Sequence, residues 1–303
     1  MKELKIDDVK KVKKWCKQGQ HFLELGEHKK AIAKYDKAIH LQPDCYDAWF
    51  FRGVALDKLA LFEEALASYK RATQIRPDEY QAWARCGYIL LKSQSYQEAI
   101  TCYDKVIESN SSRYEVWYDR GVALEKLGHF EEALVSYNKA LQIRPDEYTA
   151  WSSRGYALAK LEDYKEALAS YDKAIQIQPD FYAAWLNRGV VLEKLESFEE
   201  ALASYDKALM IKTDKDEYKV WYNRGVILDK LGDCEQAIVS YGKAIQLNPE
   251  FHPAWIDRAK ALIELDRWEE AVATLSELKK INPEIIKEQT RILSEKRRSK
   301  KAK

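Results

Sequence analysis

Eight of the nine tryptophans stand at almost constant intervals along the 303 residues, and this spacing limits what the chain can fold into. The interval is 34 residues at every step except one, which is 36. A fixed period of this length indicates a repeat protein, in which each copy is one small unit that packs on its neighbours. The repeating tryptophans are Trp15, Trp49, Trp83, Trp117, Trp151, Trp185, Trp221 and Trp255.

Other residue types keep fixed distances from these tryptophans. Glycine follows four residues later in seven copies, alanine sixteen later in all eight, and tyrosine twenty later in seven. Proline closes six copies. Apolar residues within one copy recur at helical spacing and predict two amphipathic helices, the second ended by the proline. Glycine inside the first helix costs about 1 kcal/mol relative to alanine. The recurrence of this glycine in seven copies indicates that the two helices approach each other closely, with Trp and Tyr filling the remaining space.

The order Trp, Gly, Ala, Tyr and Pro within one period resembles the tetratricopeptide repeat family, whose unit is a helix-turn-helix. The resemblance covers roughly residues 13–283. The amino-acid sequences of the copies are similar to those of bacterial, cyanobacterial-like arrays. It implies an all-α fold, a right-handed superhelical solenoid of stacked repeats over residues 1–283. Eight repeats are expected to start near residues 12, 46, 80, 114, 148, 182, 218 and 252.

One position departs from the family pattern, because arginine stands where leucine is usual. Such a side chain is expected to lay its stem on the core and keep its charge in water. The arginines are Arg52, Arg120, Arg154, Arg188, Arg224 and Arg258.

Residues 284–303 follow the last repeat and are predicted to form a capping helix and a basic tail. Ile285, Ile286, Ile292 and Leu293 give this helix an apolar side that would cover the end of the solenoid. The final "EKRRSKKAK" is too polar to pack.

Composition limits the possible partners and the setting. The net charge of +1 provides no field that attracts nucleic acid, so a nucleic-acid partner is not expected. No apolar stretch is long enough to span a bilayer, and no membrane role is expected. Five cysteines without a CxxC pair favour the reducing cytoplasm.

The sequence offers no arrangement of residues that indicates catalysis. None of the five histidines recurs with the repeat, and the recurring carboxylates lack a convergent acid or base partner. His21, Glu24 and His28 could share a helical face, but Gly26 and a turn interrupt it, so a surface cluster is favoured over a metal site. We therefore predict a protein that is not an enzyme and has no cofactor and no metal.

The positions that vary between copies carry the functional prediction. Residues one, five and eight after each Trp form a stripe on the first helix, beside the buried one. In the proteins that this chain resembles, that stripe lines the concave face and holds extended peptides. Here the triplets alternate between large, Val, acidic and small, Tyr, apolar. Alternation can reflect ordinary packing of large against small. It can also be a ladder of aromatic steps for a partner with apolar and basic residues, and we favour this for the stripe as a whole.

The stripe and two asparagines beside it form the predicted peptide-binding groove. Asn187 and Asn223, two residues after their Trp, match fragments of a carboxylate clamp found in the family. The predicted residues are Phe50, Val54, Asp57, Tyr88, Tyr118, Val122, Glu125, Tyr156, Leu186, Asn187, Val190, Glu193, Tyr222, Asn223, Val226 and Asp229.

These features predict a non-catalytic scaffold or adaptor that binds an extended peptide or a helix of a partner protein. Two alternatives stay open. The chain could be an obligate subunit of a larger complex that uses its convex face and its ends. It could also contact nucleic acid through the basic tail from Lys296 to Lys303, and binding would then weaken steeply with salt.

Overall fold

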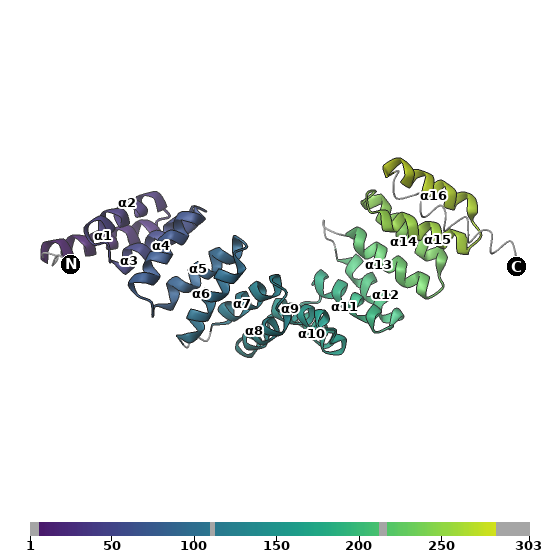
Figure 1. The fold of residues 1–303 in the computed structure, drawn as a ribbon, viewed down its shortest axis with the longest axis horizontal. Coiled ribbons are helices and arrows are strands. Elements are labelled where there is room, and N and C mark those ends of the chain that lie inside the picture. Colours follow the sequence, from purple (N-terminus) through teal and green to yellow (C-terminus); the bar gives the residue numbers. More distant parts are fainter. Residues whose placement is uncertain (1–5, 110–112, 212–216, 283–303) are drawn as a thin grey trace. The chain divides into compact units, whose positions relative to one another are not determined.

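The computed structural model describes residues 6–109, 113–211 and 217–282. All regular secondary structure in these ranges is α-helical, and the helices form successive hairpins (Figure 1). The first helices are α1 (Ile6–Glu24), α3 (Tyr46–Lys58), α5 (Tyr80–Lys92), α7 (Tyr114–Lys126), α9 (Tyr148–Lys160), α11 (Tyr182–Lys194), α13 (Glu217–Lys230) and α15 (His252–Glu264). The second helices are α2 (His28–Leu41), α4 (Phe62–Ile75), α6 (Tyr96–Glu108), α8 (Phe130–Ile143), α10 (Tyr164–Ile177), α12 (Phe198–Met210), α14 (Cys234–Leu247) and α16 (Trp268–Ile281).

The chain divides into two compact units, Met1–Ala157 and Leu158–Lys303. Within unit 1, each helix from α1 to α7 packs on the next, and α1 also contacts α3 while α5 contacts α7. Unit 2 repeats this arrangement from α10 to α16, with α11 on α13 and α13 on α15. The first helices of these neighbouring hairpins therefore lie side by side. The prediction of an all-α helical repeat is confirmed, whereas the capping helix and tail of residues 284–303 lie outside the described residues.

The recurring tyrosine of the second helix forms the centre of seven hairpins, and Leu275 takes its place in the last. Tyr137 of α8 is fully buried, and its ring lies against Gly121 of α7. A Cβ atom added at Gly121 would approach the ring to 2.6 Å, which is too close for any real contact. The recurring glycine therefore makes room for a tyrosine ring. The same pairing joins Gly19 to Tyr35 and Gly189 to Tyr205.

The recurring tryptophans are less buried than the tyrosines. Seven of the eight are partly exposed, and Trp255 alone among them is buried. In five copies the indole N–H donates to the carbonyl oxygen of the proline six residues earlier, as from Trp49 to Pro43 at 2.9 Å and from Trp185 to Pro179 at 2.8 Å. The tryptophan therefore fixes the turn between two hairpins, while the tyrosine fills the space between the helices of one hairpin.

The recurring arginine links three helices, and the expectation that its charge stays in water is wrong. Arg120 is only 16% exposed. Its Nε donates to Asp104 Oδ1 on α6 at 2.7 Å, and its Nη1 donates to Ser136 Oγ on α8 at 2.7 Å. Such charge-assisted hydrogen bonds hold one hairpin in register with the hairpin before it. Arg52, Arg188 and Arg224 make the same two bonds in their copies.

Three copies lack this network. In the α1–α2 hairpin, Gln18 stands at the arginine position. In the α5–α6 hairpin, Cys86 stands at the arginine position, Cys102 at the serine position and Lys70 at the position of the preceding aspartate. Both cysteines are buried in the core of unit 1. In the last copy, Gly242 replaces the aspartate, and Nε of Arg258 has no hydrogen-bond partner in the described part of the chain. The arginine is therefore paired only where its aspartate, or an asparagine in the case of Arg154, is present.

Candidate functional site

The sixteen residues of the predicted groove all reach the surface. None is buried, and Tyr88, Tyr156 and Val190 are the most exposed. Four of those in unit 1 also pack against the core on their inner side, namely Phe50, Val54, Tyr118 and Val122. Where first helices contact each other, as α5 contacts α7 and α11 contacts α13, the stripe continues from one hairpin to the next.

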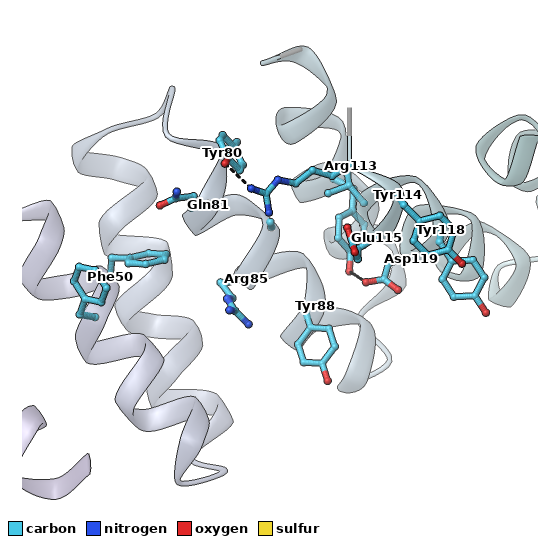
Figure 2. Close-up of a pocket in the computed structure, with 14 residues that line it drawn as sticks. Phe50, Tyr80, Gln81, Arg85, Tyr88, Arg113, Tyr114, Glu115, Tyr118 and Asp119 are labelled. Carbon is cyan, nitrogen blue, oxygen red and sulfur yellow. Dashed lines mark hydrogen bonds between the residues drawn. The ribbon is translucent and has the colours of Figure 1, made fainter. Parts of the chain in front are cut away.

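The face of the first helices in unit 1 contains a groove of about 750 Å³ between α3, α5 and α7 (Figure 2). Three predicted residues line it, namely Phe50, Tyr88 and Tyr118. Ala84 also lines it and occupies the position held by Phe50 on α3 and by Tyr118 on α7. We call this feature the unit 1 groove. It exists where a small residue stands between two large ones on neighbouring helices.

Stacked ring pairs flank the unit 1 groove. Phe50 stacks on Tyr46 with ring centres 5.7 Å apart, and Tyr118 stacks on Tyr114 at 5.6 Å. The ring planes in these pairs differ by only 8° and 12°. On α5 the matching pair is Tyr80 and Ala84, and no ring of the described residues stacks on Tyr80. Tyr46 and Tyr114 are therefore only 5% and 7% exposed, whereas Tyr80 is more exposed.

Two arginines line the same groove. The Arg113 guanidinium lies 4.9 Å from the centre of the Tyr80 ring, and its Nη2 donates to the Tyr80 hydroxyl at 2.8 Å. Arg85 points into the groove between Phe50 and Tyr88 (Figure 2), and its side chain is 52% exposed. Its nearest carboxylate oxygen belongs to Asp57, at 4.0 Å. The groove thus combines aromatic rings with guanidinium groups.

Asp119 is a groove residue that the sequence reasoning missed. Its carboxylate accepts a hydrogen bond from the Tyr103 hydroxyl at 3.4 Å. Burial raises its pKa to about 6, although this hydrogen bond and the charge of Lys92 act in the opposite direction. Asp119 stands two residues after Trp117, the same position that selected Asn187 and Asn223. Applying that position to every copy would have found it.

The acidic residues of the stripe also have partners within the fold. Glu125 accepts from the Tyr137 hydroxyl at 2.8 Å, and Asp229 accepts from the Tyr241 hydroxyl at 2.9 Å. Burial raises the pKa of both carboxyls. Glu193 instead pairs with Lys230 at 2.9 Å. Glu125 and Asp229 help to satisfy buried tyrosines, so their presence has a structural cause besides any role in binding.

The stripe of unit 2 is engaged more fully with its own side chains. Tyr222 donates its hydroxyl to Asp257 at 2.8 Å and packs on the rings of Tyr241 and Phe251. Leu186 and Val226 pack against the core clusters of this unit, while Asn187 and Asn223 are partly exposed.

The described ranges contain no group of three or more His, Cys, Asp or Glu side chains that could hold a metal ion. They also contain no helix that is both long enough and apolar enough to cross a membrane.

Helical hairpins of one length, packed in order and tied by recurring side chains, define a helical repeat protein. Models of the tetratricopeptide repeat match nearly the whole chain, and the chain belongs to this family. The matches cover residues 16–80, 87–128, 114–147, 148–181, 182–215, 218–251 and 254–284. No curated protein matches the chain.

Several solved structures are similar to this chain. YrrB, described as a TPR protein with an unusual peptide-binding site, is 25% identical with a TM-score of 0.55, covering 60% of this chain and 93% of its own. A tetratricopeptide repeat protein from Parabacteroides merdae is 16% identical with a TM-score of 0.56, covering 84% and 99%. MamA from Desulfovibrio magneticus is 20% identical with a TM-score of 0.52, covering 56% and 97%. The last two similarities show the fold alone.

Proposed function

We propose that the chain is a non-catalytic scaffold or adaptor that binds an extended peptide or a helix of a partner protein on the stripe of its first helices. The observation that carries this proposal is the unit 1 groove, because it combines exposed aromatic residues with a hollow between three first helices. Exposed aromatic residues around a pocket are typical anchors of protein interfaces. The likeness to YrrB, whose description names a peptide-binding site, supports the same class of ligand.

We also propose that the protein works in a reducing bacterial cytoplasm. All five cysteines are free thiols, which agrees with that setting.

The test is a pull-down that compares two double variants with the unaltered protein. Tyr88→Ala with Tyr156→Ala removes the two most exposed aromatic residues of the stripe in unit 1. Val135→Ala with Val239→Ala removes exposed apolar residues of the second helices α8 and α14 and is the matched control. A partner that is lost with the first pair and kept with the second supports the proposal.

The opposite result would favour the alternatives. Loss of the partner only with the Val135 and Val239 pair indicates an assembly subunit that uses the second helices. Loss only when residues 296–303 are removed, together with a steep dependence on salt, indicates contact through the basic tail.

A further inference from the structure

We propose that the unit 1 groove binds an aromatic side chain of the partner over Ala84, and that Asp119 binds a Lys or Arg close to that aromatic residue in the partner sequence. This inference rests on the proposed function and names the chemistry of the partner. It concerns unit 1 alone.

The helices α3, α5 and α7 differ in whether they carry both rings of a stacked pair. On α3 and α7 the chain supplies both rings of a stacked pair, Tyr46 with Phe50 and Tyr114 with Tyr118. On α5 it supplies only Tyr80, because Ala84 ends at its methyl group. A partner ring placed over Ala84 would stack on Tyr80 in the geometry that both neighbouring helices already show. Such offset stacking adds to the stability gained from burying the ring.

The charge around the hollow also favours an aromatic side chain. The face of an aromatic ring carries partial negative charge and attracts a guanidinium group. Arg85 lies in the groove with its side chain half exposed, and its ionic contact within the described residues is the long one to Asp57, at 4.0 Å. A ring bound over Ala84 would share the groove with this cation. An aliphatic side chain of similar size would gain neither the stacking nor the attraction to Arg85, so the groove selects for aromatic residues.

Asp119 lies on the Tyr118 side of the groove, away from Arg85 (Figure 2). Its hydrogen-bond partner is the neutral Tyr103 hydroxyl, and it forms no ion pair within the described residues. A partly buried carboxylate without a cationic partner destabilises the fold. A Lys or Arg of the partner would supply that cation. The aromatic residue and the basic residue therefore have separate positions in one groove.

The experiment is a selection of phage-displayed peptides of random sequence on the intact protein and on two variants. Ala84→Phe fills the hollow with the ring that α3 carries at this position, and Asp119→Asn removes one charge while keeping the size of the side chain. Melting curves of both variants establish that they fold. We expect the wild-type protein to enrich peptides in which an aromatic residue lies near a Lys or Arg.

The variants separate the two halves of the proposal. On Ala84→Phe, the selected peptides should bind about tenfold more weakly or worse, as is usual when an anchor pocket is lost. On Asp119→Asn, the aromatic preference should remain while the preference for Lys or Arg disappears. Enriched peptides without aromatic residues, or peptides that bind Ala84→Phe as well as wild type, would overturn the inference and leave the proposed function standing. Enrichment of no peptide at all would overturn both.

Discussion

The α5–α6 and α7–α8 hairpins have the same backbone plan and the same buried tyrosine, but they differ at the positions around it. The α7–α8 hairpin has Arg120 and Ser136 in a hydrogen-bond network, and Tyr118 on its surface. The α5–α6 hairpin has Cys86, Cys102 and Ala84 at the matching positions. The comparison teaches that the Gly and Tyr pair defines the fold, whereas the network and the surface ring can be exchanged. The groove lies where the surface ring has been exchanged.

The largest expected effect tests what the two hairpins share. Tyr137→Ala and Tyr103→Ala should each reduce the free energy of unfolding by roughly 3–5 kcal/mol. Each substitution removes a fully buried ring and leaves a cavity beside a glycine, which has no side chain to fill it. Denaturant unfolding measures both losses. Trp117→Ala should cost less than Tyr137→Ala, since the indole is partly exposed. If the tryptophan variant loses more, the tyrosine is not the centre of the hairpin.

A smaller effect tests where the hairpins differ. Arg120→Ala should cost roughly 1.5–3 kcal/mol, because it removes two hydrogen bonds of a charged group and leaves Ser136 buried. Cys86→Ala, the same position in the other hairpin, should cost about 1 kcal/mol, as is common for a point substitution. The two values come from the same unfolding experiment. Equal losses would show that the arginine network adds nothing to stability.

The third effect depends on pH and tests whether Asp119 destabilises its hairpin. Burial raises its folded-state pKa to about 6, above the ordinary 3.8. Between these values the folded protein binds more protons than the unfolded chain, so the free energy of unfolding falls as pH rises and stays lower above about pH 6. Asp119→Asn lacks this loss. The variant should be more stable than wild type by roughly 1–2 kcal/mol at pH 7.5, after allowing for partial exposure.

The control for this prediction is the same pair of proteins at about pH 3, below both pKa values, where the pH-dependent difference in stability should disappear. The charged and titratable groups around the carboxyl are Lys92 on α5, Tyr103 on α6 and Glu115 on α7. Glu115 is the other carboxyl among them, and its removal should leave the sign of the effect unchanged. An Asp119→Asn variant that is less stable than wild type at pH 7.5 would contradict the assignment.

The smallest effect makes the two hairpins more alike. Ala84→Phe should raise the free energy of unfolding by roughly 0.5–1.5 kcal/mol, because the new ring can stack on Tyr80 as Phe50 stacks on Tyr46. Thermal unfolding detects a change of this size. A lower melting temperature would show that the groove over Ala84 is too narrow for a ring.

Much of the fold could be predicted from the sequence, because the signature residues recur at fixed spacing and each copy confirms the others. The recurrence of the second-helix tyrosine and of the closing proline predicted the helical hairpins in this way. The hydrogen-bond partners of the arginines could not be predicted from the sequence, because each bond joins residues 16 or 18 positions apart on different helices. The glycine was assigned to close helix approach, while the structure shows a tyrosine ring against it.

The site was less accessible to sequence reasoning than the fold. The stripe followed from helical periodicity, but which of its members flank a hollow depends on residues that share no pattern, such as Ala84 and Arg113. Asp119 lies one position outside the stripe and is identified by its burial, which periodicity does not reveal. The acidic residues were placed in a stripe for the partner, with ordinary packing as the alternative, and the sequence did not show that Glu125 and Asp229 bind buried tyrosine hydroxyls.

Site-specific photocrosslinking tests most directly whether the stripe is the partner site. A photoreactive phenylalanine analogue would be placed at Tyr88 in the unit 1 groove and, separately, at Val135, which is 56% exposed on α8. The protein is illuminated in a lysate of its own cells, and the crosslinked partner residues are read by mass spectrometry. We predict crosslinks from position 88 to a segment that contains an aromatic and a basic residue, and none to that partner from position 135. Crosslinks from position 135 alone would contradict the account.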